Sequence, residues 1–419
     1  MREIFRQNKW FVAILLIAFA VRIIYSISVQ AWSSEFMENM ENHSDAREYN
    51  SLAIKILENG SYPDNVFLDT YRTPVFPVYI ATLYFIFGVN PYVVLLSNII
   101  LNLVILLFIY KLCIKLFDNK LIALIASALY ALEPNIVKLV TMFGTETLHS
   151  TLLIISVYYL MVGLKNKKLL SIGISSLFFG LTALTRPVSL YFYLLCIILI
   201  VLYPGGNFKY KYRIVLFFLI VYFLTLFPWM FRNYSVYGHF STNAFQGTAF
   251  IYNAGLTKSE ETGICVDTIH VEFNDAANKI CKEQNTINPF DYDKQKEILG
   301  LNYIYQHLDT YIKLHIKGML YFFVSPLANH KYSNISKIIL LGYFLFIYSF
   351  VVLGIYEMKK RKQTIYLISF SILIFYFCFL TGILGISRYR MPTTAFYLII
   401  CSFGIYNLIN KWKKKFTKL

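Results

Sequence analysis

The chain has 419 residues; 57% of them are hydrophobic, 18% are aromatic and 15% are charged, and the formal net charge is +16. So apolar a composition excludes a water-soluble globular enzyme. The positive charge does not indicate a nucleic-acid-binding protein, because the lysines and arginines collect at the ends of apolar segments, as they do in membrane proteins.

Apolar segments that are long enough to cross a bilayer recur along the whole chain, and we predict ten transmembrane helices. They cover residues 10–30, 91–117, 121–137, 147–164, 169–185, 188–203, 214–231, 338–357, 364–386 and 392–410. Basic clusters lie at alternate ends of these segments, which by the positive-inside rule places both termini in the cytoplasm. The sequence therefore predicts an all-α, multi-pass protein of the cell (inner or plasma) membrane that is surrounded by lipid and forms one domain over residues 1–419.

Two segments on the outer side are too long to be simple connections. The first, residues 31–90, ends in the apolar stretch "TPVFPVYIATLYFIFG", which is short for a span and is typical of an interfacial or re-entrant helix. The second, residues 232–337, contains an amphipathic stretch at 311–327. We place that stretch on the outer surface, because a crossing there would invert the last three basic clusters. Cys265 and Cys281 share the second segment, and the sequence leaves open whether they form a disulfide.

The stretch "SDAREYNSLAIKILENG" places an aspartate at the beginning of a predicted helix in the first outer segment. Apolar residues follow at helical spacing, and Gly60 ends the pattern. Asp45 would then lie at the N-terminal tip of this helix, near the membrane surface. An aspartate in this place usually caps its helix, and this interpretation stands beside a catalytic one.

Several charged residues lie inside the predicted spans or at their outer ends, where charge is usually paired or functional. They are Arg22, Glu146, Arg186, Arg232, Arg388 and Arg390. Each arginine taken alone is typical of a side chain that reaches up to the lipid headgroups. Together with Asp45 on the same side of the membrane, they indicate a site that binds an anionic group and holds a carboxylate beside it.

Six motifs in this order resemble the bacterial branch of the GT-C glycosyltransferases, the membrane enzymes similar to protein O-mannosyltransferases and to the lipid A aminoarabinose transferase. The motifs are "SDAREYNSLA", "YRTPVFPVYIATLYFIFG", "TETL", "GLTALTRP", "PWMFRNYSVYG" and "SRYRMP". The resemblance runs from the first helix to the last and leaves out residues 258–309.

This resemblance implies roles for individual residues. Asp45 would be the catalytic base. Many relatives have a second acid directly after it, where this chain has Ala46, so that Glu48 or Glu146 would take the second place. The donor phosphate would be held by the outer arginines Arg186, Arg388 and Arg390, with Arg22 and Arg232 as further candidates. The remaining candidates, for the acceptor and the sugar, are Tyr49, Tyr71, Arg72 and Tyr389.

The family's chemistry explains this choice of residues. Its donor is a sugar on a polyprenyl phosphate, and a composition rich in Ile, Lys and Asn, as AT-rich bacterial genomes encode, favours undecaprenyl phosphate. The acceptor hydroxyl of a glycan, lipid or protein would lose its proton to the carboxylate, and the arginines would stabilise the departing phosphate. Single displacement would invert the anomeric carbon. No Gly-rich nucleotide loop or zinc-ligand spacing is visible, and a divalent ion beside Asp45 remains an open alternative.

Two other classes of protein are compatible with a chain of this kind. A polysaccharide polymerase or ligase would use a diphosphate-linked lipid oligosaccharide and would not need the acidic first loop. A membrane transporter would be expected to show inverted repeats and broken helices, which the sequence does not show. We therefore expect an extracytoplasmic glycosyltransferase site.

Overall fold

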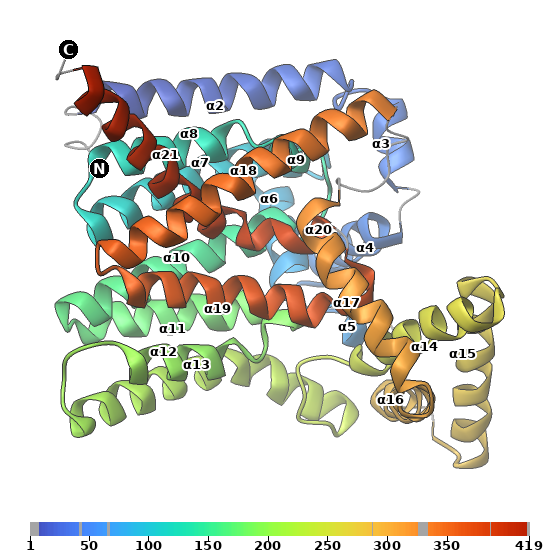
Figure 1. Cartoon of the computed structure of the whole chain (residues 1–419). Helices are drawn as coiled ribbons and strands as arrows, with labels where there is room; N and C mark the ends of the chain where they lie inside the picture. Colours follow the sequence, from blue (N-terminus) through green and yellow to red (C-terminus); the bar gives the residue numbers. More distant parts are fainter. Residues whose placement is uncertain are drawn as a thin grey trace.

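The computed structural model describes residues 8–41, 44–64, 68–286, 288–325, 334–385 and 387–416, and within these ranges the only regular elements are helices. The predicted all-α membrane fold is confirmed. Most helices run side by side in one bundle (Figure 1). The helices of this bundle are α2 (Lys9–Ser28), α7 (Tyr92–Phe117), α8 (Lys120–Ala131), α9 (Pro134–Leu139), α10 (Glu146–Asn166), α11 (Leu169–Ala183), α12 (Phe192–Leu202), α13 (Phe208–Tyr237), α18 (Asn334–Lys360), α19 (Thr364–Thr381) and α21 (Thr394–Phe416).

Seven helices among the described residues are long and apolar enough to cross a membrane. They coincide with seven of the ten predicted spans. The other three predicted spans fall on α8, α11 and α12, which have 12, 15 and 11 residues. A helix that crosses the hydrocarbon core needs about 20 residues. Seven of the ten predicted crossings thus fall on helices that are long and apolar enough to span a membrane, whereas α8, α11 and α12 are apolar helices of less than full length.

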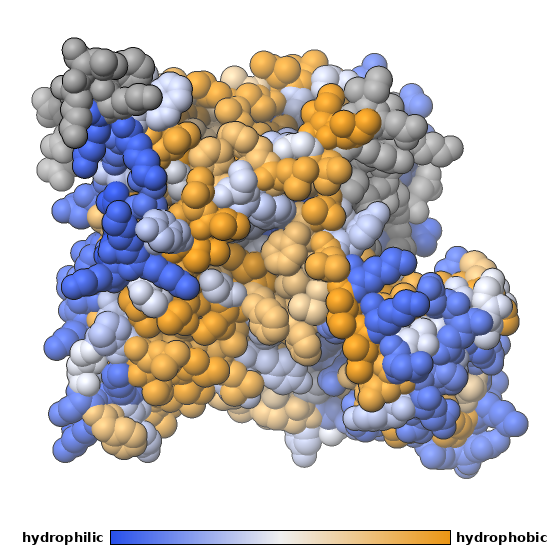
Figure 2. All heavy atoms as spheres, viewed as in Figure 1, coloured by the Kyte–Doolittle hydropathy of each residue, from blue (hydrophilic) through white to orange (hydrophobic). Residues whose placement is uncertain are grey.

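The two ends of the bundle carry different parts of the chain. The start of α2 and the end of α21 lie at one end, and the two long connecting segments lie at the opposite end (Figure 1). Apolar side chains such as Ile339, Leu345 and Val352 of α18 are exposed between the two ends. Figure 2 shows a hydrophobic face between hydrophilic ends. This distribution fits a bundle that faces lipid, with the termini on one side of the membrane and both long segments on the other.

Glycines bring the backbones of α18 and α21 into direct contact. A side chain at Gly354 would collide with the carbonyl of Ile400, and one at Gly404 would collide with the carbonyl of Phe350. Small residues allow such close approach between helices in lipid, where association depends on van der Waals packing. This contact fixes α21, whose first turn follows the arginine motif "SRYR".

The first long segment forms α3 (Ser34–Glu41), α4 (Ser44–Asn59), the single turn α5 (Leu68–Tyr71) and α6 (Val75–Phe87). With 13 residues, α6 is too short to span, as expected, and it packs against α4 and α7. Whether α6 is interfacial or re-entrant stays a prediction.

The second long segment forms α14 (Gln246–Thr262), α15 (Val266–Glu283), α16 (Pro289–Gln306) and α17 (Leu308–Val324). The first three pack on one another outside the bundle (Figure 1). The carboxylate of Asp293 on α16 accepts hydrogen bonds from the first backbone amides of α14 and so caps that helix. The amphipathic stretch predicted at 311–327 forms most of α17, and its last two residues lie outside the described ranges. Cys265 and Cys281 are free thiols.

The position of Cys265 provides a test of membrane orientation. Of the six cysteines, all of which lie in the described ranges, Cys265 is the exposed one and the other five are buried. If α14–α16 lie outside the cell, a membrane-impermeant thiol reagent should label intact cells, and Cys265→Ser should abolish that labelling. In the Cys265→Ser background, Lys360→Cys at the opposite end should react only after permeabilisation. Labelling of Cys265 that requires permeabilisation would show that the predicted orientation is inverted.

Candidate functional site

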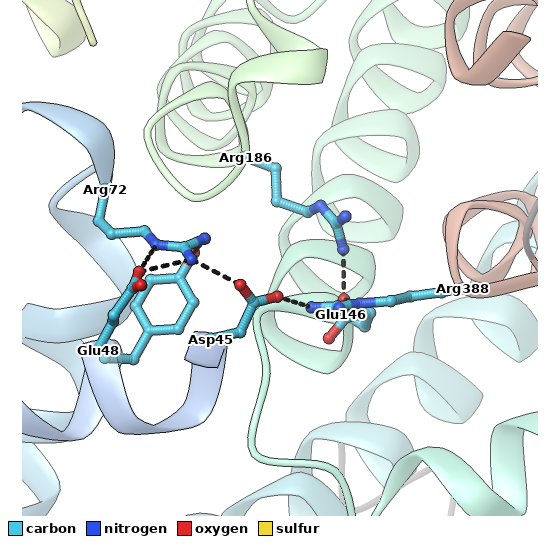
Figure 3. Close-up of polar contacts among 7 residues, drawn as sticks. Asp45, Glu48, Arg72, Glu146, Arg186 and Arg388 are labelled. Atoms are coloured by element: carbon cyan, nitrogen blue, oxygen red, sulfur yellow. Dashed lines mark hydrogen bonds and ion pairs between the residues drawn. The ribbon is translucent and has the colours of Figure 1, made fainter. Parts of the chain in front are cut away.

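Asp45 lies in the first turn of α4, and two arginines from distant parts of the chain hold its carboxylate. Arg72 donates from Nη2 to Oδ1 at 2.6 Å, and Arg388 donates from Nη2 to Oδ2 at 2.9 Å (Figure 3). Both oxygens are therefore engaged by guanidinium groups. Helix capping alone does not account for this side chain.

Arg72, directly after α5, connects Asp45 to a second carboxylate on the same helix. Its Nε and Nη2 atoms both contact Oε2 of Glu48, at 2.8 and 2.7 Å. Asp45 and Glu48 are three residues apart on α4 and thus lie on the same face of the helix, where one guanidinium can reach both. The guanidinium also lies over the rings of Tyr49 and Tyr71, at 4.8 and 5.0 Å from the centroids. The sequence candidates Glu48, Tyr49, Tyr71 and Arg72 thus meet at one place.

Glu146, the first residue of α10, connects Arg388 to a third arginine. Its Oε1 accepts from Nη1 of Arg186 at 2.6 Å and also from Nε of Arg388. Arg186 lies just before the 3₁₀ turn η1 (Pro187–Ser189), and Arg388 lies on the short helix α20 (Ser387–Arg390). The guanidinium of Arg186 is 5.3 Å from the ring centroid of Tyr389. Two segments that are far apart in the chain thus meet at the carboxylate of Glu146.

A second link fixes η1 against α10. His149 Nε2 and the hydroxyl of Ser189 are 2.7 Å apart, and both side chains are fully buried. His149 follows Glu146 by three residues, and Ser189 follows Arg186 by three, so the two links lie side by side on the same pair of elements. The sequence analysis missed this pair, since a serine or a histidine in an apolar segment has no recognisable signature by itself.

We call the six residues Asp45, Glu48, Arg72, Glu146, Arg186 and Arg388 the ion-pair network. It contains three carboxylates and three guanidinium groups, so its formal charge is zero when all are ionised. Burial disfavours the charged form of Asp45, but Arg72 and Arg388 outweigh this effect and hold the pKa of Asp45 below its ordinary value.

Exposure distinguishes the members of the network. The side chains of Asp45 and Arg388 are 34% and 30% exposed, whereas Arg72 and Arg186 are 14% and 13% exposed and Glu146 is 1% exposed. The Asp45–Arg388 pair is thus the part of the network most open to an incoming molecule.

Arg232, near the C-terminal end of α13, lies in a different cluster. Its Nη2 contacts Oδ2 of Asp69 at 2.6 Å and Oδ1 of Asp64 at 2.8 Å. The hydroxyl of Tyr237 donates to the same Asp69 oxygen at 2.6 Å. Asp69 is fully buried. It was not among the residues singled out from the sequence, because nothing in the sequence indicates that an aspartate in a polar loop will be buried.

Arg22 and Arg390 also lie outside the ion-pair network. Both are fully buried. Arg22 donates to the carbonyls of Ala18 and Ala131, and Arg390 donates to those of Phe322 and Ser325. The arginines that the sequence places on one side of the membrane are therefore divided among separate sites, and a phosphate-binding role for these two stays a prediction. Among the described residues no group of three or more His, Cys, Asp or Glu side chains is arranged to hold a metal ion.

Comparison with known proteins supports the resemblance seen in the motifs. The sequence profile of the family "Dolichyl-phosphate-mannose-protein mannosyltransferase" matches residues 71–231. The matched part contains Arg72, Glu146 and Arg186 of the ion-pair network. No curated protein sequence matches the chain.

Solved structures share the fold. One is the oligosaccharyltransferase AglB from Archaeoglobus fulgidus in complex with an inhibitory peptide and a dolichol-phosphate, with 14% identity, a TM-score of 0.59, and 99% of this chain and 52% of that chain covered. The apo form of the A. fulgidus oligosaccharyltransferase gives 14% identity, a TM-score of 0.60, and coverages of 97% and 51%. This chain thus spans about half the length of those proteins. ArnT from Cupriavidus metallidurans bound to undecaprenyl phosphate is a more distant likeness, at 11% identity, a TM-score of 0.41 and coverages of 95% and 77%.

Gly144 provides a test of how strongly the network depends on the position of Glu146. A side chain at Gly144 would collide with Oε2 of Glu146 and come within 3.7 Å of Arg388 Nη2. Gly144→Ala should therefore displace a buried, paired carboxylate and lower the stability by on the order of 1–3 kcal/mol. The measurement is the thermal unfolding midpoint of the purified protein. The control is Gly342→Ala, where no atom lies within 4 Å of the new methyl group and the midpoint should stay the same or rise slightly. Equal midpoints for both variants would contradict a rigid network.

Proposed function

We propose, from the match of residues 71–231 to the profile of the dolichyl-phosphate-mannose-protein mannosyltransferase family, that this chain is a membrane glycosyltransferase with a polyprenyl-phosphate-linked sugar as its donor. The observation that carries the proposal is the ion-pair network. It places a partly exposed carboxylate beside guanidinium groups at the end of the bundle that holds both long segments. An oligosaccharyltransferase of the same fold was solved in complex with dolichol-phosphate, which belongs to the same chemical class as the proposed leaving group.

The geometry favours Asp45 as the base. Glu146 is buried, and one of its oxygens is held by two arginines, so an acceptor hydroxyl has no access to it. Glu48 is paired with Arg72 alone, while Asp45 lies between the two halves of the network (Figure 3). In this assignment Glu146 positions Arg186 and Arg388, and Asp45 removes the proton from the acceptor hydroxyl as the hydroxyl attacks the anomeric carbon. The bond from that carbon to the phosphate oxygen breaks, and polyprenyl phosphate leaves.

The charges of the network indicate how the donor enters. A phosphodiester brings one negative charge to a set of six groups that is already neutral, so it must take over an arginine that now pairs with a carboxylate. Arg388 is the most exposed of the three arginines, and its planar fork can hold a phosphate through two hydrogen bonds. When the phosphate binds Arg388, Oδ2 of Asp45 is released. Asp45 then becomes a stronger base, because one of the two cations that lower its pKa is engaged elsewhere.

The remaining groups fit the rest of the reaction. The leaving phosphate gains negative charge, which the fixed guanidinium groups of Arg186 and Arg388 stabilise. The rings of Tyr49, Tyr71 and Tyr389 border the arginines and offer flat apolar surfaces to a sugar. Attack from the side opposite to the phosphate would invert the anomeric configuration. The proposed site faces the outside of the cell membrane, both termini lie in the cytoplasm, and undecaprenyl phosphate is the proposed carrier.

The test of this assignment is Asp45→Asn with synthetic polyprenyl-phosphate sugars as donors. Asparagine keeps the shape of the side chain and caps a helix about as well, but it cannot accept the proton. The value of kcat should fall by roughly 10²–10⁴-fold, while the protein still folds and retains bound donor lipid. Turnover is measured by release of polyprenyl phosphate.

Glu48→Gln is the control on the same helix and should have a milder effect, because it removes a partner of Arg72 and leaves the base. An Asp45→Asn protein with unchanged kcat would contradict the role of Asp45. Turnover with diphosphate-linked oligosaccharides but with no monophosphate-linked sugar would assign the chain to the polymerases and ligases. Transport of a substrate without release of polyprenyl phosphate would assign it to the transporters.

A further inference from the structure

Arg72 comes directly after α5, a single helical turn, and so short a turn cannot hold a side chain in place by itself. Two hydrogen bonds hold the backbone carbonyls of Thr70 and Arg72. The amide of Ala244 donates to the carbonyl of Thr70 at 2.9 Å, and the hydroxyl of Tyr62 donates to the carbonyl of Arg72 at 3.2 Å. The rings of Tyr71 and Phe245 also meet edge to face, at 4.7 Å between their centroids.

The strongest anchor of this turn is the buried side chain of Asp69. One of its oxygens, Oδ2, accepts from Arg232 Nη2 and from the hydroxyl of Tyr237, both at 2.6 Å. Asp69 is fully buried and Arg232 is 18% exposed. Removal of one partner of a buried charge pair strongly destabilises the folded protein, because the other charge is left buried without a partner. We therefore infer that this contact holds α5 against α13.

The same arginine is surrounded by aromatic rings. Its guanidinium carbon lies 5.1 Å from the ring centroid of Trp229, 5.4 Å from that of Tyr237 and 5.7 Å from that of Tyr62. Tyr62 packs edge to face against Trp229 at 4.7 Å and is the residue whose hydroxyl binds the carbonyl of Arg72. The cluster around Arg232 is therefore connected to Arg72 in two ways. Asp69 lies three residues before Arg72 in the chain, and the hydroxyl of Tyr62 binds the carbonyl of Arg72.

We propose that Asp69, Arg232 and Tyr237 are positioning residues that hold Arg72 against Asp45 and Glu48. The proposal rests on the proposed function, in which Arg72 remains paired with Asp45 after the donor phosphate has bound Arg388. It gives Arg232 a different part from the phosphate ligand that the sequence analysis expected. Arg232 engages Asp64 and Asp69, and it acts on the site through α5.

The chain provides a matched pair of aspartates for the test. Asp64 and Asp69 contact the same Nη2 atom of Arg232, but the Asp64 side chain is 68% exposed and that of Asp69 is fully buried. An exposed ion pair contributes little, so Asp64→Asn should leave activity close to that of the wild type. Asp69→Asn should lower kcat/KM by roughly 10- to 100-fold, because the reacting groups are displaced by a fraction of an ångström or more. Tyr237→Phe removes one hydrogen bond to the same oxygen and should have a smaller effect in the same direction.

The pH profile separates positioning from a general loss of structure. Arg72 and Arg388 face Asp45 and lower its pKa, and Glu48 and Tyr49 lie on the same helix beside Arg72. If Asp69→Asn displaces Arg72, the pKa of Asp45 rises, and activity is lost at a higher pH as the solution becomes more acidic. Arg72→Gln should shift this acidic limb in the same direction, and adding Asp69→Asn to it should cause no further shift. If Asp69→Asn lowers activity at every pH but leaves the acidic limb of the pH–activity profile unchanged, the proposal is overturned. It is also overturned if the two substitutions shift that limb additively in the double variant.

A second readout does not require turnover. A water-soluble carbodiimide with an amine modifies carboxylates that are free of ion pairs, and mass spectrometry of the peptide that contains Asp45 and Glu48 measures the rate. That rate should rise in Asp69→Asn toward the rate in Arg72→Gln and should stay at the wild-type rate in Asp64→Asn. Equal rates in Asp69→Asn and wild type would overturn the proposal. If no variant and no wild-type protein transfers sugar, while the labelling follows this order, the proposed function fails and the positioning of Arg72 stands.

Discussion

The carboxylate of Asp45 is held between two guanidinium groups that come from opposite parts of the chain, and the rest of the site depends on this contact. Arg72 reaches it from the first long segment and Arg388 from the segment before α21. Through Arg388, the interaction joins α4, which lies outside the bundle, to Glu146 on α10 and to Arg186 before η1. A carboxylate between two cations is well fixed but is a weak base, and in the proposed function the donor phosphate releases one of the two cations.

The membrane explains why these charges are organised in networks. A charged group that enters the apolar part of a helical bundle must find a partner or a backbone carbonyl, because water is scarce there. The arginines of this chain show both solutions. Arg186, Arg232 and Arg388 pair with acids, and Arg22 and Arg390 donate to carbonyls near the ends of neighbouring helices. In the proposed function Arg388, the most exposed arginine of the first group, exchanges a carboxylate for a phosphate. The second group is fully buried and lies apart from the ion-pair network.

The sequence was sufficient to predict the helices and to single out charged residues at their ends, because both signals are local. A long apolar run by itself predicts a membrane helix, and an arginine within or at the end of such a run is rare enough to indicate a functional or paired residue. The ion pairs between these residues could not be predicted from the sequence. Arg388 has no acid near it in the chain, and its partners Asp45 and Glu146 come from α4 and α10, which only tertiary packing brings together. The importance of Asp69 was hidden for the same reason, since burial and the contact with Arg232 arise from the fold. The short helices α8, α11 and α12 mark a further limit, because periodicity and hydropathy do not fix where a helix ends.

The most direct test of the account is a structure of the protein with a non-reacting analogue of a polyprenyl-phosphate sugar. The measured quantity is the distance between the guanidinium of Arg388 and the carboxylate of Asp45, compared with that in the protein without the analogue. We expect the phosphate to lie within hydrogen-bonding distance of Arg388, with Oδ2 of Asp45 free to face the anomeric carbon and Arg72 still on Oδ1. A phosphate bound at Arg22 or Arg390, with the Asp45–Arg388 pair intact, would contradict it.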